Sequence, residues 1–354
     1  MSGNDQPSRG RRGALHIAEV AAMAGVSIAT VSRALANPDR VSAKTRAHVL
    51  EVVRRTGYTP NIAGRSLRAA SSLTVLVVVP NLITPFFSNL LLGVDRALSA
   101  KGYGMLIGNL QDGDAKELAL VDLVRSGQAD GVLLLNGHVL RSPTGTLADL
   151  GVPMVAVSVP AGVDSVPTVV VEEREGAAAI ARHLLDLGHR SFGYVTGPAE
   201  SFIEAERWAG FSGTLAESGI PPRQVARYPG DFHVRSGFAA GEAFLRQRRR
   251  PTAVFAVSDM MAIGFMRAVH AAGLSVPRDV SVAGFDDIPA ASWASYQLTS
   301  FVQDGAGMVG EAVAMLQAAT ASTRPFGGRR VVLSSRLVER NSTARAAATP
   351  GQPS

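Results

Sequence analysis

The spacing of hydrophobic positions changes near residue 73. Before it, apolar residues recur every three or four positions in short stretches, which predict helices over residues 17–24, 28–36 and 42–55. Gly25 is expected to turn the chain between the first two helices, and Ser27 to cap the second. Two helices joined by a glycine turn and braced by a third are typical of a helix-turn-helix domain.

After residue 73, valine-rich apolar runs alternate with amphipathic helical segments. Strands are predicted at residues 73–79, 104–107, 131–135, 154–157, 168–171, 192–195, 253–257 and 280–283, with a last strand at 330–337. Continuous apolar strands between helices indicate parallel sheets that are covered on both faces. The predicted fold class is therefore an N-terminal all-α helix-turn-helix domain followed by an α/β core of two doubly wound parallel-sheet lobes.

These patterns also predict the domain boundaries. The helical domain is expected at residues 14–59, a connector that is compatible with a short helix at 60–72, and the α/β core at 73–342. Its lobes are placed at about 73–160 with 290–325, and at about 161–289 with 326–342. Flexible tails are expected at 1–13 and 343–354 because these segments lack apolar periodicity.

Composition excludes several classes of protein. The 354 residues include no cysteine, which excludes disulfides, thiolate metal sites and a cysteine nucleophile. Because no apolar run approaches 18 residues and the first 13 residues are polar and basic, we expect no membrane association and a cytoplasmic location. We find no nucleophile or metal-ligand constellation, and the acidic Glu172, Glu173 and Glu175 are interpreted as a charged helix start. We therefore expect no catalytic residues, no metal and no cofactor.

Positive charge is concentrated at one end of the chain. Residues 1–70 hold eleven Lys or Arg and four Asp or Glu, whereas the remainder carries a net charge of about −1. This asymmetry predicts a polyanionic partner for the N-terminal module. Charge alone leaves open that this is merely a solvated surface.

Sequence motifs decide between these alternatives. The residues Ile17-Ala-Glu-Val-Ala21, Gly25-Val-Ser27 and Thr30-Val-Ser-Arg33 resemble the DNA-binding signature of the lactose-repressor (LacI/GalR) family. The resemblance continues in family order to about residue 342, through Val41-Ser-Ala-Lys-Thr-Arg46, Gly57-Tyr-Thr-Pro-Asn61, Gly188-His-Arg190, Asp259-Met-Met-Ala-Ile-Gly264, Gly284-Phe-Asp286 and Leu337-Val-Glu-Arg340. It implies a homodimeric, ligand-controlled transcription repressor with a periplasmic-binding-protein-like core, and a hinge helix within residues 60–72.

The resemblance assigns DNA contacts residue by residue. Base readout falls on Ile28, Ala29 and Arg33, of which Arg33 can bind guanine through two hydrogen bonds. Contacts to the phosphate backbone are expected from Ser27, Thr30, Ser32, Arg40, Lys44 and Thr45. In the hinge, Asn61, Ala63, Leu67 and Arg68 are expected at the minor groove, with Leu67 as a wedge between base pairs.

The core is expected to hold a small effector beyond the carboxyl ends of its strands. Candidate contacts are Asn81, Phe86, Phe87, Ser158, Arg207, Phe232, Asp259 and Asp286. Aromatic faces, carboxylates and a guanidinium suit a sugar or sugar derivative. For Asp259 and Asp286 a helix-capping or structural role stays open, and for the two phenylalanines a role in the core or a dimer contact. Because Ser201, Phe202 and Ile203 lack charge, a purine is less expected.

Three functions compete. We predict a nucleoid-associated repressor of carbohydrate-metabolism genes that binds palindromic double-stranded operator DNA as a homodimer and is released allosterically by its effector. The alternatives are a sugar-binding sensor without a DNA role and an α/β enzyme. The basic helical module argues against the sensor, and the lack of a catalytic constellation against the enzyme.

Overall fold

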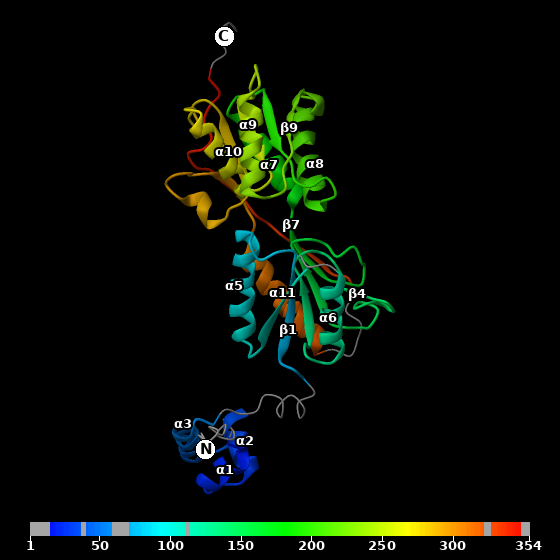
Figure 1. Ribbon diagram of the computed structural model, residues 1–354, viewed down its shortest axis with the longest axis vertical. Coiled ribbons are helices and arrows are strands. Elements are labelled where there is room, and N and C mark those ends of the chain that lie inside the picture. The colour runs from blue at the N-terminus through cyan, green and yellow to red at the C-terminus, as the bar shows by residue number, and fades with distance from the viewer. Residues whose placement is uncertain (1–14, 37–39, 59–70, 111–113, 322–326, 348–354) are drawn as a thin grey trace, which may run out of the picture. The chain divides into compact units, whose positions relative to one another are not determined.

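The computed structural model describes residues 15–36, 40–58, 71–110, 114–321 and 327–347. The chain divides into two compact units, residues 1–72 and residues 73–354 (Figure 1).

The first unit consists of three helices around a small apolar core. They are α1 (Ile17–Met23), α2 (Ile28–Ala36) and α3 (Ala43–Thr56). The core is formed by residues from all three helices and the two flanking turns, namely Val20, Ala21, Ala24, Val31, Ala34, Val49, Val52 and Tyr58. The three predicted helices are confirmed to within one residue at each end.

Local side-chain chemistry explains where these helices begin and end. Ser27 Oγ accepts a hydrogen bond from the backbone N–H of Thr30 at 3.1 Å, and Ser42 Oγ accepts one from Thr45 N–H at 3.2 Å. Each bond gives an additional acceptor to an N–H in the first turn of its helix, which favours a helix start at that position. Gly25 has φ of 61°, a conformation that favours glycine and that turns the chain between α1 and α2.

The second unit contains two six-stranded sheets. In the first sheet the strand order is β13-β7-β6-β3-β1-β2, and every pairing is parallel. Its strands are β1 (Thr74–Val79), β2 (Gly104–Asn109), β3 (Gly131–Leu134), β6 (Met154–Val157), β7 (Thr168–Val171) and β13 (Arg330–Leu333). A two-stranded ribbon, β4 (Arg141–Ser142) with β5 (Gly145–Thr146), lies between β3 and β6 in the sequence.

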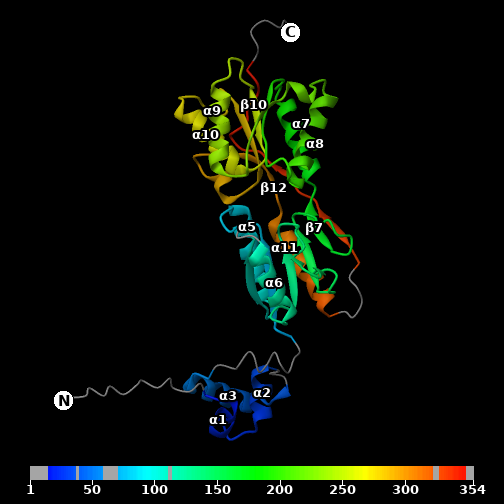
Figure 2. The same cartoon turned by 45° about the vertical axis from the view of Figure 1, so that its right-hand side comes forward.

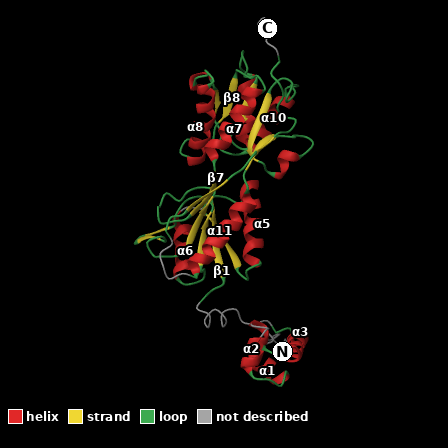
Figure 3. Cartoon of the chain, turned by 180° about the vertical axis from the view of Figure 1, so that it is seen from behind, coloured by secondary structure: helices red, strands yellow, loops and turns green. Residues whose placement is uncertain are grey.

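Both faces of the first sheet are covered. Val75, Val77 and Val79 of β1 pack in one cluster with α5 (Pro85–Ser99) and α11 (Gly305–Thr320). The alternate residues Leu76 and Val78 pack in another cluster with α6 (Asp114–Arg125). Figure 3 shows these helices in red on either side of the yellow strands. Burial on both faces explains why β1 reads as a continuous apolar run.

In the second sheet the strand order is β14-β12-β11-β10-β8-β9, and only β14 is antiparallel to its neighbour. The strands are β8 (Phe192–Val195), β9 (Ala226–Tyr228), β10 (Ala253–Ala256), β11 (Ser281–Asp286), β12 (Thr299–Val302) and β14 (Leu337–Val338). Helix α7 (Glu173–Asp186) packs on α8 (Phe202–Glu217), and α9 (Val234–Leu245) packs on α10 (Asp259–Ala271), with the two pairs flanking the sheet (Figure 2). Short 3-10 turns lie at Pro222–Gln224 and Pro289–Ser292.

The fold class is confirmed, but the chain crosses between the lobes at other points than predicted. Residues 168–171 pair in the first sheet and residues 299–302 in the second, each opposite to the prediction. The single strand predicted at 330–337 is two strands, β13 in the first sheet and β14 in the second. Valine-rich runs look alike in both lobes, so strand membership depends on long-range pairing that the local pattern does not contain.

The prediction of a flexible tail from residue 343 is wrong for residues 343–347. Ala344 N–H donates to Ser281 Oγ at 3.0 Å, and Ala346 N–H donates to the Leu187 carbonyl at 2.8 Å. The buried His189 places Nε2 3.0 Å from the carbonyl of Ala344. These polar contacts hold residues 343–347 against the second lobe, although this segment has no apolar periodicity.

Across the described residues, no single helix is long and apolar enough to cross a membrane; α1 and α2 pass that test only as a pair, which is bent by 101°.

Candidate functional site

The exposed face of α2 carries the residues predicted to read bases. Ile28 is 46% exposed, and Ala29 and Arg33 are also exposed. The Nε–H of Arg33 donates to the Ala29 carbonyl at 3.1 Å, which lays the guanidinium along the helix surface. An exposed apolar residue beside a guanidinium suits contacts with a base edge, because the thymine methyl is apolar and guanine offers two acceptors.

Three of the hydroxyl groups predicted to touch phosphate, those of Ser27, Thr30 and Thr45, lie at helix N-termini. Ser27 Oγ and Thr30 Oγ1 lie 2.9 Å apart, and Ser42 Oγ and Thr45 Oγ1 lie 2.8 Å apart. Each cap holds a hydroxyl pair beside the free N–H groups of a helix N-terminus, where an anion is favoured. The other predicted phosphate contacts on described residues, Ser32, Arg40 and Lys44, lie at the surface, with Ser32 half-buried. Asn61, Ala63, Leu67 and Arg68 lie outside the described residues.

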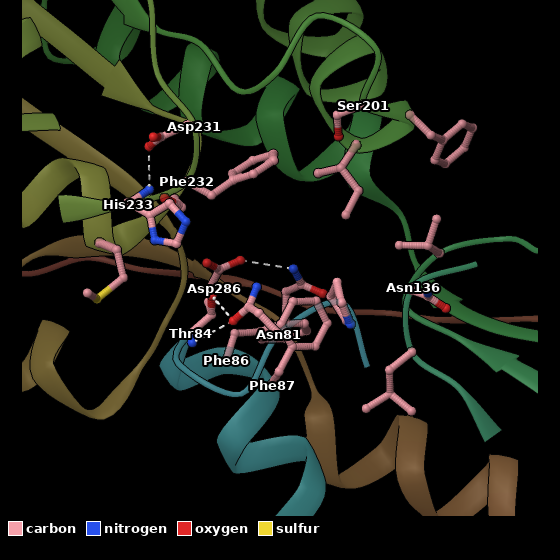
Figure 4. A pocket seen from close by; sticks show the side chains of 18 of the residues that line it. Asn81, Thr84, Phe86, Phe87, Asn136, Ser201, Asp231, Phe232, His233 and Asp286 are labelled. Carbon is pink, nitrogen blue, oxygen red and sulfur yellow. Dashed lines mark hydrogen bonds between the residues drawn. The ribbon is translucent and has the colours of Figure 1, made fainter. Parts of the chain in front are cut away.

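The second unit contains a cavity of about 430 Å³ between the carboxyl ends of the strands of its two sheets. Its first wall comes from segments after β1, β3 and β6: Pro80, Asn81, Thr84, Phe86, Phe87, Leu135, Asn136 and Val159. Its second wall comes from segments after β8, β9, β10 and β11 together with Gln303 after β12: Glu200, Ser201, Phe202, Ile203, Arg207, Asp231, Phe232, His233, Ser258, Met260, Asp286, Ile288 and Gln303. Figure 4 shows aromatic and polar side chains from both walls around this space. Its volume is in the range of small-molecule sites.

Six of the eight residues proposed from the sequence line this cavity, namely Asn81, Phe86, Phe87, Arg207, Phe232 and Asp286. The other two do not. Ser158 is 1% exposed and precedes the lining residue Val159, and Asp259 is fully buried behind the wall.

Asp259 has a structural position. Its Oδ2 accepts a hydrogen bond from Ile288 N–H at 2.8 Å, and its Oδ1 accepts one from Ser300 Oγ at 2.6 Å. A Cβ on Gly284 would lie 2.3 Å from Asp259 Oδ1, so the glycine leaves room for the carboxylate. Burial, reinforced by the Asp286 carboxylate nearby, raises the pKa of Asp259 well above its ordinary value. Asp259 therefore joins the start of α10 to the loop that follows β11.

Arg207 is the centre of a buried charge cluster. Its Nε–H donates to Glu173 Oε2 at 2.7 Å, and its Nη2 lies 3.4 Å from Asp286 Oδ1. It also donates to the Val257 carbonyl, and its guanidinium carbon lies 3.6 Å from the ring centroid of Phe285. The Arg207 side chain is 2% exposed, so these contacts replace the water that a guanidinium would otherwise bind.

The acids of this cluster are perturbed by burial. Burial raises the pKa of Asp286 to about 6, although Arg207 and the amide of Gln303 favour its charged form. Burial also raises the pKa of Glu173, and Arg207 offsets part of that rise. Acids with shifted pKa values at the base of a cavity are typical of functional sites.

Two cavity residues have strained backbones. Asp286 has φ of 112° and Phe232 has φ of 67°, conformations that are uncommon for residues other than glycine. A Cβ on Gly197 would lie 2.6 Å from the Phe232 ring, so this glycine admits the ring to the wall. Such conformations cost about 1–3 kcal/mol each and cluster at functional sites.

Several lining or supporting residues were not predicted from the sequence. Gln303 directly follows β12, and Asp231 and His233 follow β9, two strands that were not predicted from the sequence, so the rule of strand carboxyl ends could not point to these residues. Glu173, which was interpreted from the sequence as part of a charged helix start, is indeed the first residue of α7, but it is 4% exposed and paired with Arg207. No local signal distinguishes it from the exposed Glu172 and Glu175.

Comparison with known proteins matches both units. A family model described as bacterial regulatory proteins of the lacI family matches residues 16–61, and one described as a periplasmic binding protein-like domain matches residues 181–343. The HTH-type transcriptional repressor CytR of Escherichia coli K12 is 36% identical over 287 residues, which is 80% of this chain and 84% of that protein.

Two solved structures match nearly the whole chain. A complex of the transcriptional regulator CelR with cellobiose has 32% identity and a TM-score of 0.68, and the match covers 93% of this chain and 99% of CelR. The Lac repressor dimer bound to operator and the anti-inducer ONPF has 27% identity and a TM-score of 0.77, with the same coverage. By sequence along most of its length and by fold in both units, the chain belongs to the LacI family of transcriptional regulators.

Proposed function

We propose that this chain represses carbohydrate-metabolism genes by binding a palindromic operator as a homodimer, and that a small sugar-like effector releases it. The observation that carries this proposal is the cavity of about 430 Å³ lined by both lobes of a chain that also has a helix-turn-helix unit. A ligand held by both lobes favours one lobe arrangement over another, which is how a binding site becomes a switch.

On DNA, α2 would occupy the major groove. Arg33 would bind guanine, while Ile28 and Ala29 would pack on thymine methyl groups or exclude other bases. Phosphate contacts would come from Ser27, Thr30, Ser32, Arg40, Lys44 and Thr45. The hinge within residues 60–72 would place Asn61, Ala63, Leu67 and Arg68 at the minor groove, with Leu67 between two base pairs.

In the core, we propose that five residues contact the effector directly: Asn81, Phe86, Phe87, Phe232 and Asp286. Arg207 would face the effector while it stays bound to Glu173 and Asp286. Phenylalanine rings offer apolar faces for the C–H groups of a sugar, and the carboxylate and amide groups bond its hydroxyls. The CelR complex with cellobiose supports a saccharide. Ser158 and Asp259 would act indirectly, through the backbone that they support.

The effector would act by allosteric coupling. A coupling of about 1–3 kcal/mol between effector and operator corresponds to roughly a 5- to 150-fold change in DNA affinity. We place the protein in the cytoplasm at the nucleoid, without a catalytic step, a metal or a cofactor, as expected of a chain whose relatives are transcriptional regulators.

Sequencing of genomic fragments captured by the purified full-length protein tests this function. We expect enrichment of one palindromic site whose half-sites have the spacing of a dimer. Addition of metabolites linked to the neighbouring genes should then release the DNA. Fragments captured without any common site, together with binding of a sugar, would instead indicate the sensor without a DNA role.

A further inference from the structure

The deep end of the cavity presents hydrogen-bond acceptors. Gln303 is 7% exposed, and its Nε2 donates to Asp286 Oδ1 at 2.9 Å, the dashed line drawn at Asp286 in Figure 4. Because only the amide NH₂ can donate to a carboxylate, this bond fixes the orientation of the amide. Gln303 Oε1 is then buried without a hydrogen-bond partner in the described part of the chain. Because Gln303 lines the cavity, a ligand held there can supply the donor that this buried acceptor lacks.

The single guanidinium on the described lining is already neutralised. Arg207 contacts two carboxylates, those of Glu173 and Asp286, at 2.7 Å and 3.4 Å. Its positive charge is therefore balanced before any ligand enters, and its side chain is held against Phe285 and the Val257 carbonyl. A ligand that carried a phosphate or carboxylate would have to compete with these two acids for Arg207.

The remaining charged side chains on the lining do not favour an anion either. Asp231 and Glu200 are exposed carboxylates on the second wall, and His233 is the other basic residue there. Asp231, Glu200 and Asp286 place three carboxylates on the lining, against two basic residues, Arg207 and His233. Glu173 does not line the cavity and is bound to Arg207. A negative charge brought next to the buried Asp286 carboxylate is disfavoured, because water screens it little there, whereas the exposed Asp231 and Glu200 add a weaker, screened repulsion.

We propose that this cavity selects an effector without negative charge that donates hydrogen bonds to Gln303 Oε1 and Asp286, and that it rejects phosphorylated or carboxylated forms of the same molecule. The inference rests on the proposed function, in which this cavity is the effector site. Hydroxyl and amine groups supply the required donors, whereas a phosphate dianion or a carboxylate supplies only acceptors. The rings of Phe86, Phe87 and Phe232 line the cavity and would pack against the apolar part of the ligand.

A thermal-shift assay with charge-separated ligand pools tests this selection. The small-molecule fraction of yeast extract is passed over an anion exchanger at pH 7, and each pool is added to the full-length protein. We expect the unretained pool, which holds neutral and cationic compounds, to raise the melting temperature, and the retained pool to leave it unchanged. A rise confined to the retained pool would overturn the selection but not the effector function. A rise with neither pool would overturn both.

Matched probes sharpen the result. The same assay and calorimetry compare each neutral parent compound with its charged derivatives. The comparisons are D-glucose with glucose 6-phosphate and with gluconate, D-ribose with ribose 5-phosphate, cellobiose with cellobionate, and cytidine with cytidine monophosphate. For every parent that binds, we expect its charged derivative to bind at least about tenfold more weakly. Any derivative that binds more tightly than its parent contradicts the proposal.

A variant tests the role of Gln303 itself. Gln303→Met keeps the length of the side chain but removes both the acceptor and the bond to Asp286, and we expect it to weaken binding of the active parent compound at least about tenfold. Gln224→Met, at an exposed position in the turn at Pro222–Gln224, is the matched control and should bind normally. Ligand-free melting temperatures identify any loss due to misfolding; unchanged affinity in a folded Gln303→Met would exclude Gln303 as an acceptor for the ligand.

Discussion

Glu173 Oε2 accepts a 2.7 Å hydrogen bond from Arg207 Nε, and both side chains are less than 5% exposed. The first residue of α7 thus holds a guanidinium contributed by α8, whose other side reaches Asp286 at the end of β11. This relationship fixes the position of the charge cluster at the base of the cavity.

Removal of Glu173 should therefore destabilise the core. Glu173→Ala leaves the Arg207 charge buried with one partner fewer, and we expect a loss of about 3–5 kcal/mol in the free energy of unfolding, measured by urea denaturation. Glu175→Ala, which removes an exposed pair with Arg182, is the control and should cost less than about 1 kcal/mol. Equal denaturation midpoints for the two variants would contradict a structural role of the buried pair.

Arg33 should determine one base of the operator. Arg33→Ala is expected to weaken operator binding by about 1–3 kcal/mol and to relax preference at that base, as measured by fluorescence anisotropy on a set of single-base operator variants. Arg54→Ala is a matched control, because Arg54 Nε bonds the carbonyl of Leu50 on α3 as Arg33 Nε bonds that of Ala29. If both variants keep the wild-type order of base preference, Arg33 does not read a base.

Lys44 should contribute through phosphate alone. Lys44→Ala is expected to weaken binding about equally for all operator variants and to reduce the slope of log affinity against log salt by about 1. Titrations of wild type and variant between 50 and 200 mM salt, concentrations that bracket the steep part of this dependence, measure the change. A loss that depends on the base sequence would assign Lys44 to readout instead.

Leu67 is predicted as a wedge in the minor groove and lies outside the described residues. Leu67→Ala should weaken operator binding by a few kcal/mol, because the cost of unstacking the base pairs is no longer offset by an inserted side chain. Effector binding by the same full-length variant should be unchanged. Gel shifts measure operator binding and calorimetry measures effector binding. Equal operator affinity of the variant and the wild type would contradict the role of Leu67 as a wedge.

His189 should make stability depend on pH. Burial lowers the pKa of His189 below its ordinary value of 6.5, although the Ala344 carbonyl acts in the opposite direction. Below pH 6.5 the unfolded chain therefore binds a proton at His189 more readily than the folded chain does. The contribution of the neutral His189 to the free energy of unfolding is present above pH 6.5 and is lost as the pH falls below it. His189→Gln should show a flatter fall in the free energy of unfolding between pH 7 and 5 than wild type, with His183 still contributing. Parallel curves would show that His189 does not titrate on unfolding.

The helical unit and the edge that carries the cavity could be predicted from the sequence. Gly25, Ser27 and Ser42 act within three or four residues of themselves, so their effect on helix ends is contained in the local sequence. Likewise Asn81 and Asp286 follow predicted strands, and parallel strands bring their carboxyl ends to one edge whatever their order.

Only the tertiary structure decided the strand order and the partners within the site. Residues 168–171 and 299–302 exchanged lobes relative to the prediction because strand pairing joins residues far apart in the chain. Glu173 carries the same carboxylate as the exposed Glu172 and Glu175, yet its burial makes it the partner of Arg207, and burial likewise makes Asp259 a structural anchor. Local periodicity determines helices and strands, whereas burial and charge pairing depend on which distant surfaces meet.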